Sequence, residues 1–382
     1  MVDFSKAFDR QDHTILITKL SDMNVPGWLL RIVISFLTNR KMVVRYKGAM
    51  SGLKELPGGG PQGTLLGLLL FLVLINDVGF PNQENNIGEQ ITRRQNFKAV
   101  NVLHLKYVDD LTLLESIKLR DQLIEVPESA VTHPVSYRAR TGHVLPLTNS
   151  EVYKQLIATE EYANQNKMKI NYTKTKTMLF NNCKNLDFLP ELEVADIRVE
   201  NSEEMKILGV VVTPDLKWNA NTRHIVQKAF KRMWILRRLK NNGAETQELK
   251  DVYIKQIRSI LELAVPAWHP GLTVQNTIDI EQVQRAALQI MLGQEFRSYN
   301  SALNILNLES LATRREKLCL TFSKKASKHW KHSNWFNENN KDKETRLPRP
   351  KYCPVFSRTK RFKNSPISYL TGLLNQFYQK RK

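Results

Sequence analysis

Three carboxylates in this sequence stand where they could hold divalent metal ions. Asp3 ends a short apolar stretch that predicts a strand, and Asp109 and Asp110 lie at the turn of a hairpin predicted for residues 100–114. If these strands are neighbours in one sheet, the carboxylates meet in a small patch. Like charges about 4 Å apart repel by about 4 kcal/mol at an effective dielectric constant of about 20, so such a cluster needs cations or a proton. Oxygen ligands without nearby His or Cys suit Mg²⁺ or Mn²⁺, and two such ions can clamp both oxygens of a phosphoryl transfer.

Each of these features is common by itself, because Asp pairs are frequent on exposed turns and loops of glycine and proline are usually only connections. Here the carboxylates flank such a loop at residues 57–61, which can be neither helix nor central strand, and Gln62 follows it directly. The order of these features therefore favours the chemistry of a polymerase.

The elements around these residues follow from the spacing of apolar side chains. A long apolar run over residues 65–75 is too short to cross a membrane and predicts a buried core helix. Polar insertions at residues 81–95 and 120–150 predict surface loops. In the first part of the chain, helices are predicted on both sides of a turn at 24–27 and at about 62–76 and 151–166, and a hairpin is predicted from residue 42. Strands are predicted at 1–4, 169–172, 177–180 and 205–212. From residue 219 onward the chain is predicted to be helical, with one helix starting at 219 and others at about 246–263, 278–292 and 311–331.

The charge balance indicates a polyanionic partner. Fifty-seven Lys and Arg face 37 Asp and Glu, which gives a formal net charge of +20. Such an excess usually accompanies nucleic acid, with a solvated basic face as the alternative. Many of these charges surround the apolar stripe of a predicted helix after residue 219, namely Lys228, Lys231, Arg232, Arg237 and Arg238.

The three cysteines favour a reducing compartment, because they are few and far apart. Cys319 and Cys353 flank a His-x-x-His pair, His329 and His332, but the spacing fits no common zinc module, and free thiols are the preferred interpretation. No secretory signal is present, and no membrane role is expected.

Five motifs in order resemble the palm motifs of reverse transcriptases from retrotransposons that lack long terminal repeats. Two further segments, residues 231–239 and 266–269, resemble the helices that follow the palm in the jockey-like clade, so the similarity covers about residues 1–325. The five motifs are Val2-Asp3-Phe4-Ser5-Lys6-Ala7-Phe8-Asp9, Pro61-Gln62-Gly63-Thr64-Leu65-Leu66-Gly67, Tyr107-Val108-Asp109-Asp110, Asn171-Tyr172-Thr173-Lys174-Thr175 and Met205-Lys206-Ile207-Leu208-Gly209-Val210.

The resemblance implies an RNA-directed DNA polymerase that uses Mg²⁺, or Mn²⁺, with an RNA template, a DNA primer and deoxynucleotide triphosphates. Asp3 and Asp109 would hold the two metals, with Asp110 as the third carboxylate. Phe8 would exclude the 2′-hydroxyl of a ribonucleotide, because a flat ring under the sugar leaves no room for one more oxygen. The alternative is that Phe8 is an ordinary core residue. An intracellular protein that reaches the nucleus is expected, although no import signal is clear.

The other motif residues would contact the nucleotide and the nucleic acid. Gln62 and Gly63 would lie beside the incoming nucleotide and template, since glycine permits close backbone approach. Lys174 would donate a proton to the leaving pyrophosphate, or be an ordinary surface lysine. Leu208 and Gly209 would grip the primer, and the five basic residues named above would bind nucleic acid.

The expected architecture is an α+β palm, an antiparallel sheet with helices on one face, over residues 1–215. A helical thumb at 216–335 and a basic, partly disordered tail at 336–382 would follow. The chain departs from the family in two ways, because Leu68 replaces the usual proline and the sequence starts two residues before Asp3, where the family has a fingers region. We therefore expect a truncated copy that polymerises poorly, with a catalytically inactive, nucleic-acid-binding remnant as the alternative.

Overall fold

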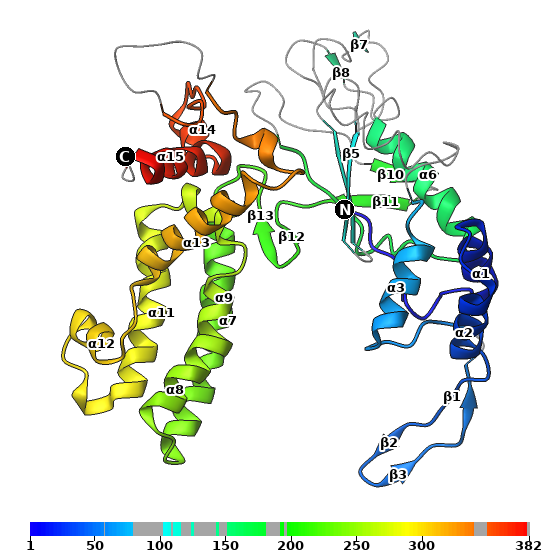
Figure 1. Cartoon of the computed structure of the whole chain (residues 1–382), viewed down its shortest axis with the longest axis horizontal. Helices are drawn as coiled ribbons and strands as arrows, with labels where there is room; N and C mark the ends of the chain where they lie inside the picture. The colour runs from blue at the N-terminus through cyan, green and yellow to red at the C-terminus, as the bar shows by residue number, and fades with distance from the viewer. Residues whose placement is uncertain are drawn as a thin grey trace. The chain divides into compact units, whose positions relative to one another are not determined.

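The chain forms two compact units, Met1–Ser202 and Glu203–Lys382, in a computed structural model (Figure 1). The structure describes residues 1–56, 58–78, 102–107, 110–115, 124–125, 143–144, 151–180, 192–194, 197–339 and 350–379. Helices and short, mostly antiparallel sheets are mixed along the chain, which agrees with the predicted α+β class.

The helices of the first unit match the predictions closely. α1 (His13–Asp22) and α2 (Gly27–Leu37) lie on either side of the predicted turn, and the Asp12 carboxylate caps α1 by accepting from the Ile15 amide. α6 (Glu151–Gln165) also lies where it was predicted. These elements enclose a core that includes Leu16, Leu37, Phe71, Leu111 and Ile170.

The predicted buried helix, α3 (Leu65–Leu74), is shorter than expected and buries only one face. Thr64 caps it by accepting from the Gly67 amide, so the helix begins three residues later than predicted. Phe71 and Leu74 are fully buried, whereas Leu65 and Leu69 are exposed. The predicted core position is confirmed for this face, whereas the sequence could not show which face packs, because the apolar run is unbroken.

A polar cluster fixes the carboxyl end of α3 to α1 and α6. The Lys19 ammonium donates to the Leu74 carbonyl at 2.7 Å and pairs with the Asp77 carboxylate at 2.7 Å. The Tyr162 hydroxyl, from α6, donates to the same carboxylate at 2.8 Å. Burial raises the pKa of Tyr162, so this hydroxyl keeps its proton and remains a donor.

The sheet around the predicted carboxylates is built from short pieces. β5 (Val102–Tyr107) and β6 (Asp110–Glu115) form the predicted hairpin, in which Tyr107 pairs with Asp110. The strand predicted at 169–172 is reduced to a bridge, and that at 177–180 to β9 (Lys176–Thr177). β9 pairs in parallel with β11 (Ile197–Asn201), which pairs with β10 (Leu192–Val194), and neither β10 nor β11 was predicted.

The hairpin predicted from residue 42 is present and extends away from α2 (Figure 1). β1 (Lys41–Met42) pairs with β4 (Lys54–Glu55), and β2 (Arg45–Tyr46) pairs with β3 (Ala49–Met50). The loops predicted at 81–95 and 120–150 lie outside the described residues, apart from the paired β7 (Ile124–Glu125) and β8 (His143–Val144).

The second unit begins with a hairpin where a single strand was predicted. β12 (Met205–Ile207) pairs with β13 (Val210–Val212), and Leu208 and Gly209 form the turn with φ of 48° and 88°. The hairpin packs on α7 (Asn219–Asn241), where the Val211 amide donates to the Asn221 side chain at 3.1 Å. The boundary between the two compact units therefore falls at residue 202.

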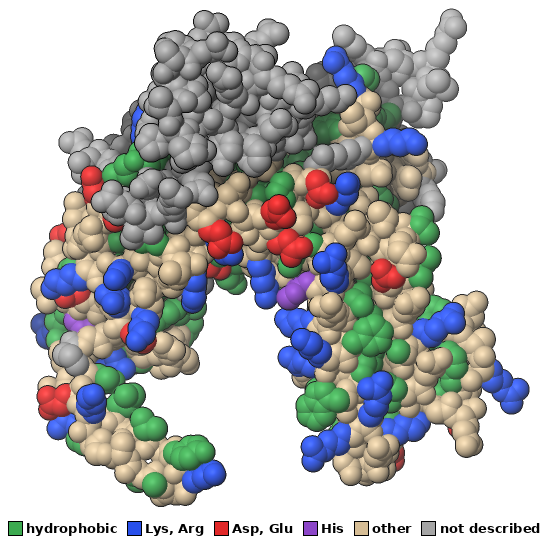
Figure 2. Space-filling model, turned by 180° about the vertical axis from the view of Figure 1, so that it is seen from behind, with side chains coloured by type: hydrophobic (Ala, Val, Ile, Leu, Met, Phe, Trp, Pro, Cys, Tyr) green, Lys and Arg blue, Asp and Glu red, His purple; other side chains and the backbone are tan. Residues whose placement is uncertain are grey.

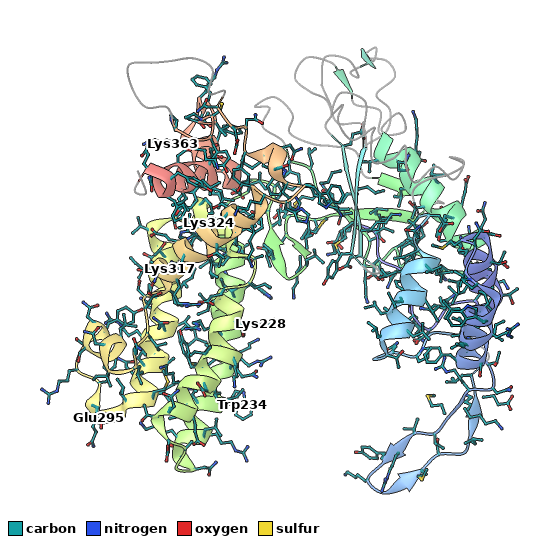
Figure 3. All side chains as sticks on the ribbon, viewed as in Figure 1. Lys228, Trp234, Glu295, Lys317, Lys324 and Lys363 are labelled. Atoms are coloured by element: carbon teal, nitrogen blue, oxygen red, sulfur yellow. The ribbon has the colours of Figure 1, made fainter. Side chains whose placement is uncertain are left out.

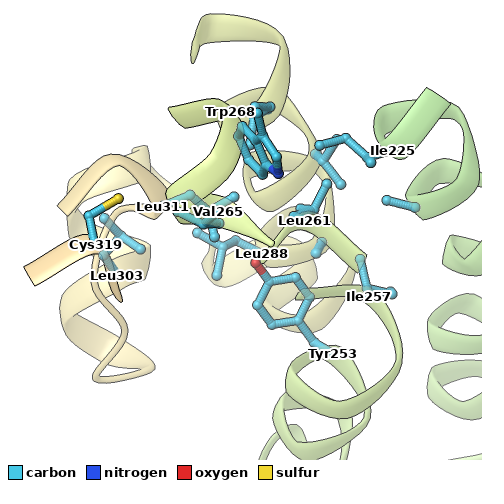
Figure 4. Packing of buried hydrophobic residues seen from close by; sticks show 14 of the residues in the cluster. Ile225, Tyr253, Ile257, Leu261, Val265, Trp268, Leu288, Leu303, Leu311 and Cys319 are labelled. Atoms are coloured by element: carbon cyan, nitrogen blue, oxygen red, sulfur yellow. The ribbon is translucent and has the colours of Figure 1, made fainter. Parts of the chain in front are cut away.

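Helices make up the rest of the second unit. The predicted apolar stripe of α7 is confirmed, since Ile225, Ala229, Met233 and Leu236 are buried. Figure 4 shows part of the core that this stripe shares with the following helices. These are α8 (Thr246–Val252), the π-helical η4 (Tyr253–Arg258), α9 (Ser259–Leu261), α10 (Val265–Trp268), η5 (His269–Gly271), α11 (Val274–Leu292), η6 (Gly293–Glu295), α12 (Tyr299–Ile305), α13 (Leu311–Ala326) and η7 (Ser333–Trp335).

The end of the chain is better ordered than predicted. Within the described residues, α14 (Lys360–Lys363) and α15 (Pro366–Gln379) stand in the segment predicted as a partly disordered tail. Leu370 and Leu374 of α15 are buried in the core of the second unit, and α15 packs against α13. In the described part of the chain, no helix combines the length and the apolar character needed to cross a membrane.

Candidate active site

The first residues of the chain form the middle of a three-stranded antiparallel arrangement. On one side, the Val2 amide donates to the Leu111 carbonyl at 2.7 Å. On the other side, the Asn171 amide donates to the Asp3 carbonyl at 2.7 Å, and the Ser5 amide donates to the Lys169 carbonyl at 2.7 Å. The main chain of Asp3 is therefore held by neighbours on both sides.

This register brings two of the predicted carboxylates together. Because Val2 bridges Leu111 in antiparallel register, Asp3 lies opposite Asp110, one residue further along each strand. Opposite residues of an antiparallel pair point to the same face with Cβ atoms about 5 Å apart. Val2 and Leu111 are buried on the other face, so the carboxylates belong to the face that is partly exposed. Asp109, the third predicted carboxylate, lies outside the described residues.

Asp3 stands at the edge of a pocket of about 470 Å³. Its lining combines four predicted site residues, Asp3, Phe8, Gln62 and Lys174, with motif residues to which the sequence assigned no role of their own. The latter are Phe4, Ser5, Lys6, Ala7, Asp9 and Asn171. The predicted residues from three separate motifs thus share one surface.

Phe8 lines the pocket and also packs against the core of the first unit, so its position is compatible with both interpretations left open by the sequence. Its ring stacks on Phe71 of α3, with centroids 4.4 Å apart and planes 24° apart. Phe71 is fully buried, whereas Phe8 is partly exposed and lines the pocket. The core therefore holds the Phe8 ring in place at the pocket wall.

The glycine loop brings Gln62 to this wall. The Gln62 side-chain amide donates to the Asp9 carboxylate at 3.1 Å. Gly59 has a φ of 81°, and a Cβ there would lie 3.0 Å from the Asp9 carbonyl oxygen, so a side chain would separate the two segments. Gly63 also has a positive φ, of 81°, but open space surrounds it and it does not line the pocket.

Two lysines balance the charge of the pocket. Lys174 and Lys6 are both exposed and line it together with Asp3 and Asp9. Lys6 was missed because a lysine in a loop carries no signal of its own, and its φ of 50° places it in a tight turn. Asn171 connects the predicted motifs, since its amide donates to Asp3 and its carbonyl accepts from the Thr175 hydroxyl at 2.9 Å.

The donors at this site fit a hard divalent cation. The pocket lining offers carboxylate, amide and hydroxyl oxygens without His or Cys, which suits Mg²⁺ or Mn²⁺ better than zinc. Within the described ranges, no three His, Cys, Asp or Glu side chains are grouped to hold a metal, and Asp109 is not among those residues. Two of the residues weighed as zinc ligands in the sequence differ in exposure, since Cys319 is fully buried and His329 is exposed.

Known proteins with similar sequences point to one class of enzyme. No protein-family model matches the chain. It is 22% identical over 336 residues to the probable RNA-directed DNA polymerase from transposon BS of Drosophila melanogaster, covering 86% of this chain and 32% of that protein. It is 25% identical over 232 residues to the RNA-directed DNA polymerase from mobile element jockey of Drosophila funebris, covering 60% and 21%.

The chain is similar to RNA-directed DNA polymerases of mobile elements. The resemblance inferred from the five motifs is thereby confirmed. The matches span about a third of the length of the transposon BS protein and about a fifth of the jockey protein.

The polymerase-like motifs of the second unit lie on two of its elements. Leu208 and Gly209 form the turn between β12 and β13, and Leu208 is exposed. Four of the predicted nucleic-acid-binding residues are exposed on α7, and the fifth, Arg232, is half-buried and donates to the Gln256 side chain at 2.8 Å. The four exposed residues are Lys228, Lys231, Arg237 and Arg238.

Exposed aromatic rings on α7 were not predicted. Trp234 is 56% exposed and Phe230 is 42% exposed, four residues apart and therefore on one side of the helix. Figure 2 shows basic and apolar side chains interleaved on this unit, and Figure 3 shows Lys228 and Trp234 projecting from α7. The spacing of Phe230 and Trp234 could have indicated that both rings are exposed, because both fall outside the buried stripe of α7.

Proposed function

We propose that the chain is the polymerase portion of an RNA-directed DNA polymerase from a non-LTR retrotransposon. In this proposal residues 1–215 are the palm, and the helical region at 216–335, which begins with α7, is the thumb. The observation that carries it is the register that sets Asp3 opposite Asp110 beside a pocket lined by Phe8, Gln62 and Lys174. The similarity to the transposon polymerases supports the same class of reaction.

Asp3, Asp109 and Asp110 would hold two divalent cations, which when bound supply charge neutralisation at the attacking and leaving oxygens. The residues of the chain then have separate tasks. The backbone hydrogen bonds on both sides of Asp3 fix the main chain that carries its carboxylate, which would favour reaction because positioning limits phosphoryl transfer. Lys6 and Lys174 supply positive charge for the triphosphate, and Lys174 is also the candidate proton donor to pyrophosphate.

Phe8 would select the nucleotide. Its ring is backed by Phe71, so it cannot move aside for an extra oxygen without disturbing the core. Gln62 would contact the nucleotide or template from the opposite segment, held by its hydrogen bond to Asp9.

Primer extension on an RNA template tests this proposal. With Mg²⁺ and deoxynucleotides, we expect synthesis that falls at least about 100-fold in Asp3→Asn, because the variant removes one charge from the metal site. Asp22→Asn is the matched control, since it makes the same charge change at an exposed position at the end of α1. Equal synthesis by Asp3→Asn and the wild type would refute the assignment of the site.

A second function, nucleic-acid binding without synthesis, is supported by the charge of the second unit. Residues 203–382 carry 33 Lys and Arg against 15 Asp and Glu, whereas residues 1–202 carry 24 against 22. The basic excess therefore lies almost entirely in the unit that bears α7. Salt-dependent binding of primer–template with no metal-dependent synthesis would favour this function.

A further inference from the structure

The segment that follows α13 carries four aromatic rings in contact with one another. Trp330 and His329 stack with centroids 6.0 Å apart, and His329 and His332 stack at 5.2 Å. His332 and Trp335 follow at 4.5 Å. We call Trp330, His329, His332 and Trp335 the ring stack.

The two ends of the ring stack differ. Trp335 is half-buried and packs against the core of the second unit. Trp330 is 64% exposed, so it adds little to that core. The stack is thus anchored at one end and leaves an exposed aromatic surface at the other. Packing alone explains Trp335 but not the placement of Trp330.

The surroundings of the ring stack are basic. Residues 317–337 contain no Asp or Glu, and Lys325, Lys328 and Lys331 are exposed. The Lys331 ammonium lies 5.0 Å from the centre of the Trp330 ring. Lys324 is engaged differently, because its ammonium lies 3.3 Å from the centre of the Phe377 ring of α15 (Figure 3).

We propose that the ring stack binds single-stranded nucleic acid, with a base stacking on the exposed part of Trp330 and with Lys325 and Lys328 facing the phosphates. Aromatic rings beside a basic surface favour unpaired strands, because only an unpaired base offers its face to a side chain. This inference rests on the proposed function only in that a polymerase handles single strands, and its site is distinct from the pocket at Asp3.

Binding of a fluorescein-labelled oligodeoxythymidylate or oligouridylate tests this site. Fluorescence anisotropy is measured without Mg²⁺ or nucleotides, with excess unlabelled RNA–DNA duplex present to occupy duplex-binding surfaces. Trp330→Ala should weaken binding about tenfold, while Trp330→Phe should retain most of it. Trp28→Ala is the matched control, since Trp28 of α2 is 60% exposed, and it should bind like the wild type.

The lysines give a second readout. Lys325→Ala and Lys328→Ala each remove one phosphate contact. Each variant should therefore make the negative slope of log K against log salt less steep by about 0.7. Unchanged binding by Trp330→Ala, or an equal loss by Trp28→Ala, would overturn the proposal. In the absence of the unlabelled duplex, a smaller Trp330→Ala defect with a labelled duplex than with the labelled strand supports the proposal, and an equal defect on the duplex overturns the preference for single strands.

The failure of this proposal is distinguishable from the failure of the proposed function. Asp3→Asn should abolish synthesis and leave oligonucleotide binding unchanged. Synthesis that depends on Asp3 together with binding that ignores Trp330 sinks the ring stack alone. Binding that depends on Trp330 without Asp3-dependent synthesis sinks the polymerase site alone.

Discussion

Phe8→Val tests whether the ring at the pocket wall selects the nucleotide or only fills the core. Stacking on Phe71 contributes about 1 kcal/mol, and the carbon atoms lost from a half-buried ring contribute about as much again. The variant should therefore lose about 2 kcal/mol of unfolding free energy. Phe71→Leu is the matched control, because it breaks the same stacking pair inside the core and should also lose about 2 kcal/mol.

The two variants should differ in nucleotide choice. Phe8→Val opens the pocket wall, so the ratio of ribonucleotide to deoxynucleotide incorporation should rise by up to about 100-fold, the discrimination that an apolar pocket achieves against one added hydroxyl. Phe71→Leu leaves the Phe8 ring in the pocket and should change this ratio little. The ratio is measured by single-nucleotide primer extension, and the stability by urea denaturation.

Two results would refute this reasoning. If both variants raise ribonucleotide incorporation equally, the ratio reports a loosened core rather than a ring at the sugar. If Phe8→Val loses stability without any change in the ratio, Phe8 is only a core residue. A chain without measurable synthesis still allows the comparison, by competition of ribonucleotides and deoxynucleotides for binding.

Three further predictions concern other parts of the chain. Gly59→Ala should lose about 2 kcal/mol more unfolding free energy than Gly48→Ala in urea denaturation, because both have positive φ but a Cβ at Gly59 meets backbone. Burial raises the pKa of the Cys319 thiol to about 12, so iodoacetamide at pH 8 should label Cys353 and spare Cys319, as read by mass spectrometry. Burial lowers the pKa of His269 to about 4, so the neutral ring is favoured in the folded state, and about 2 kcal/mol of stability should be present above pH 6.5 and lost as pH falls toward 4, but not in His269→Gln.

Helices were predictable where one face is apolar and the other polar. The stripe of α7 is such a case, because Ala229, Met233 and Leu236 recur at helical spacing among charged residues. α3 has no such contrast, so its helix was predictable and its buried face was not. α15 was missed because the segment that precedes it is rich in basic residues and proline, which hid the apolar spacing of Leu370 and Leu374.

The β12–β13 hairpin could not be predicted, because its turn lacks the usual residues. Two-residue hairpin turns with positive φ at both positions favour Asn-Gly or Asp-Gly. Here Leu208 takes the first position with a φ of 48°, and only Gly209 is typical. The residues on both sides of this Leu-Gly pair, Met205–Ile207 and Val210–Val212, therefore predicted one continuous strand.

The meeting of the motifs in one pocket was predictable from their order, but the details depend on contacts between distant segments. The pairing of Val2 with Leu111 is such a contact, since nothing in either segment alone specifies its partner. Lys6 joined the pocket through the same long-range packing. The sequence could therefore suggest candidate residues for chemistry, but it could not indicate which neighbours line the same pocket.

The distribution of charge explains why the two units suit different tasks. The cation site proposed at Asp3 and Asp110 would need surroundings that do not repel cations, and the nearly balanced charge of the first unit fits this need. A formal charge of +18 on the second unit instead attracts nucleic acid at long range, and the attraction is screened by salt. Had the excess been spread over both units, strong binding of nucleic acid would have opposed the binding of Mg²⁺ at the pocket. Placing the basic excess beside Trp234 and Trp330, away from the carboxylates in sequence, would let one chain carry both of the proposed sites.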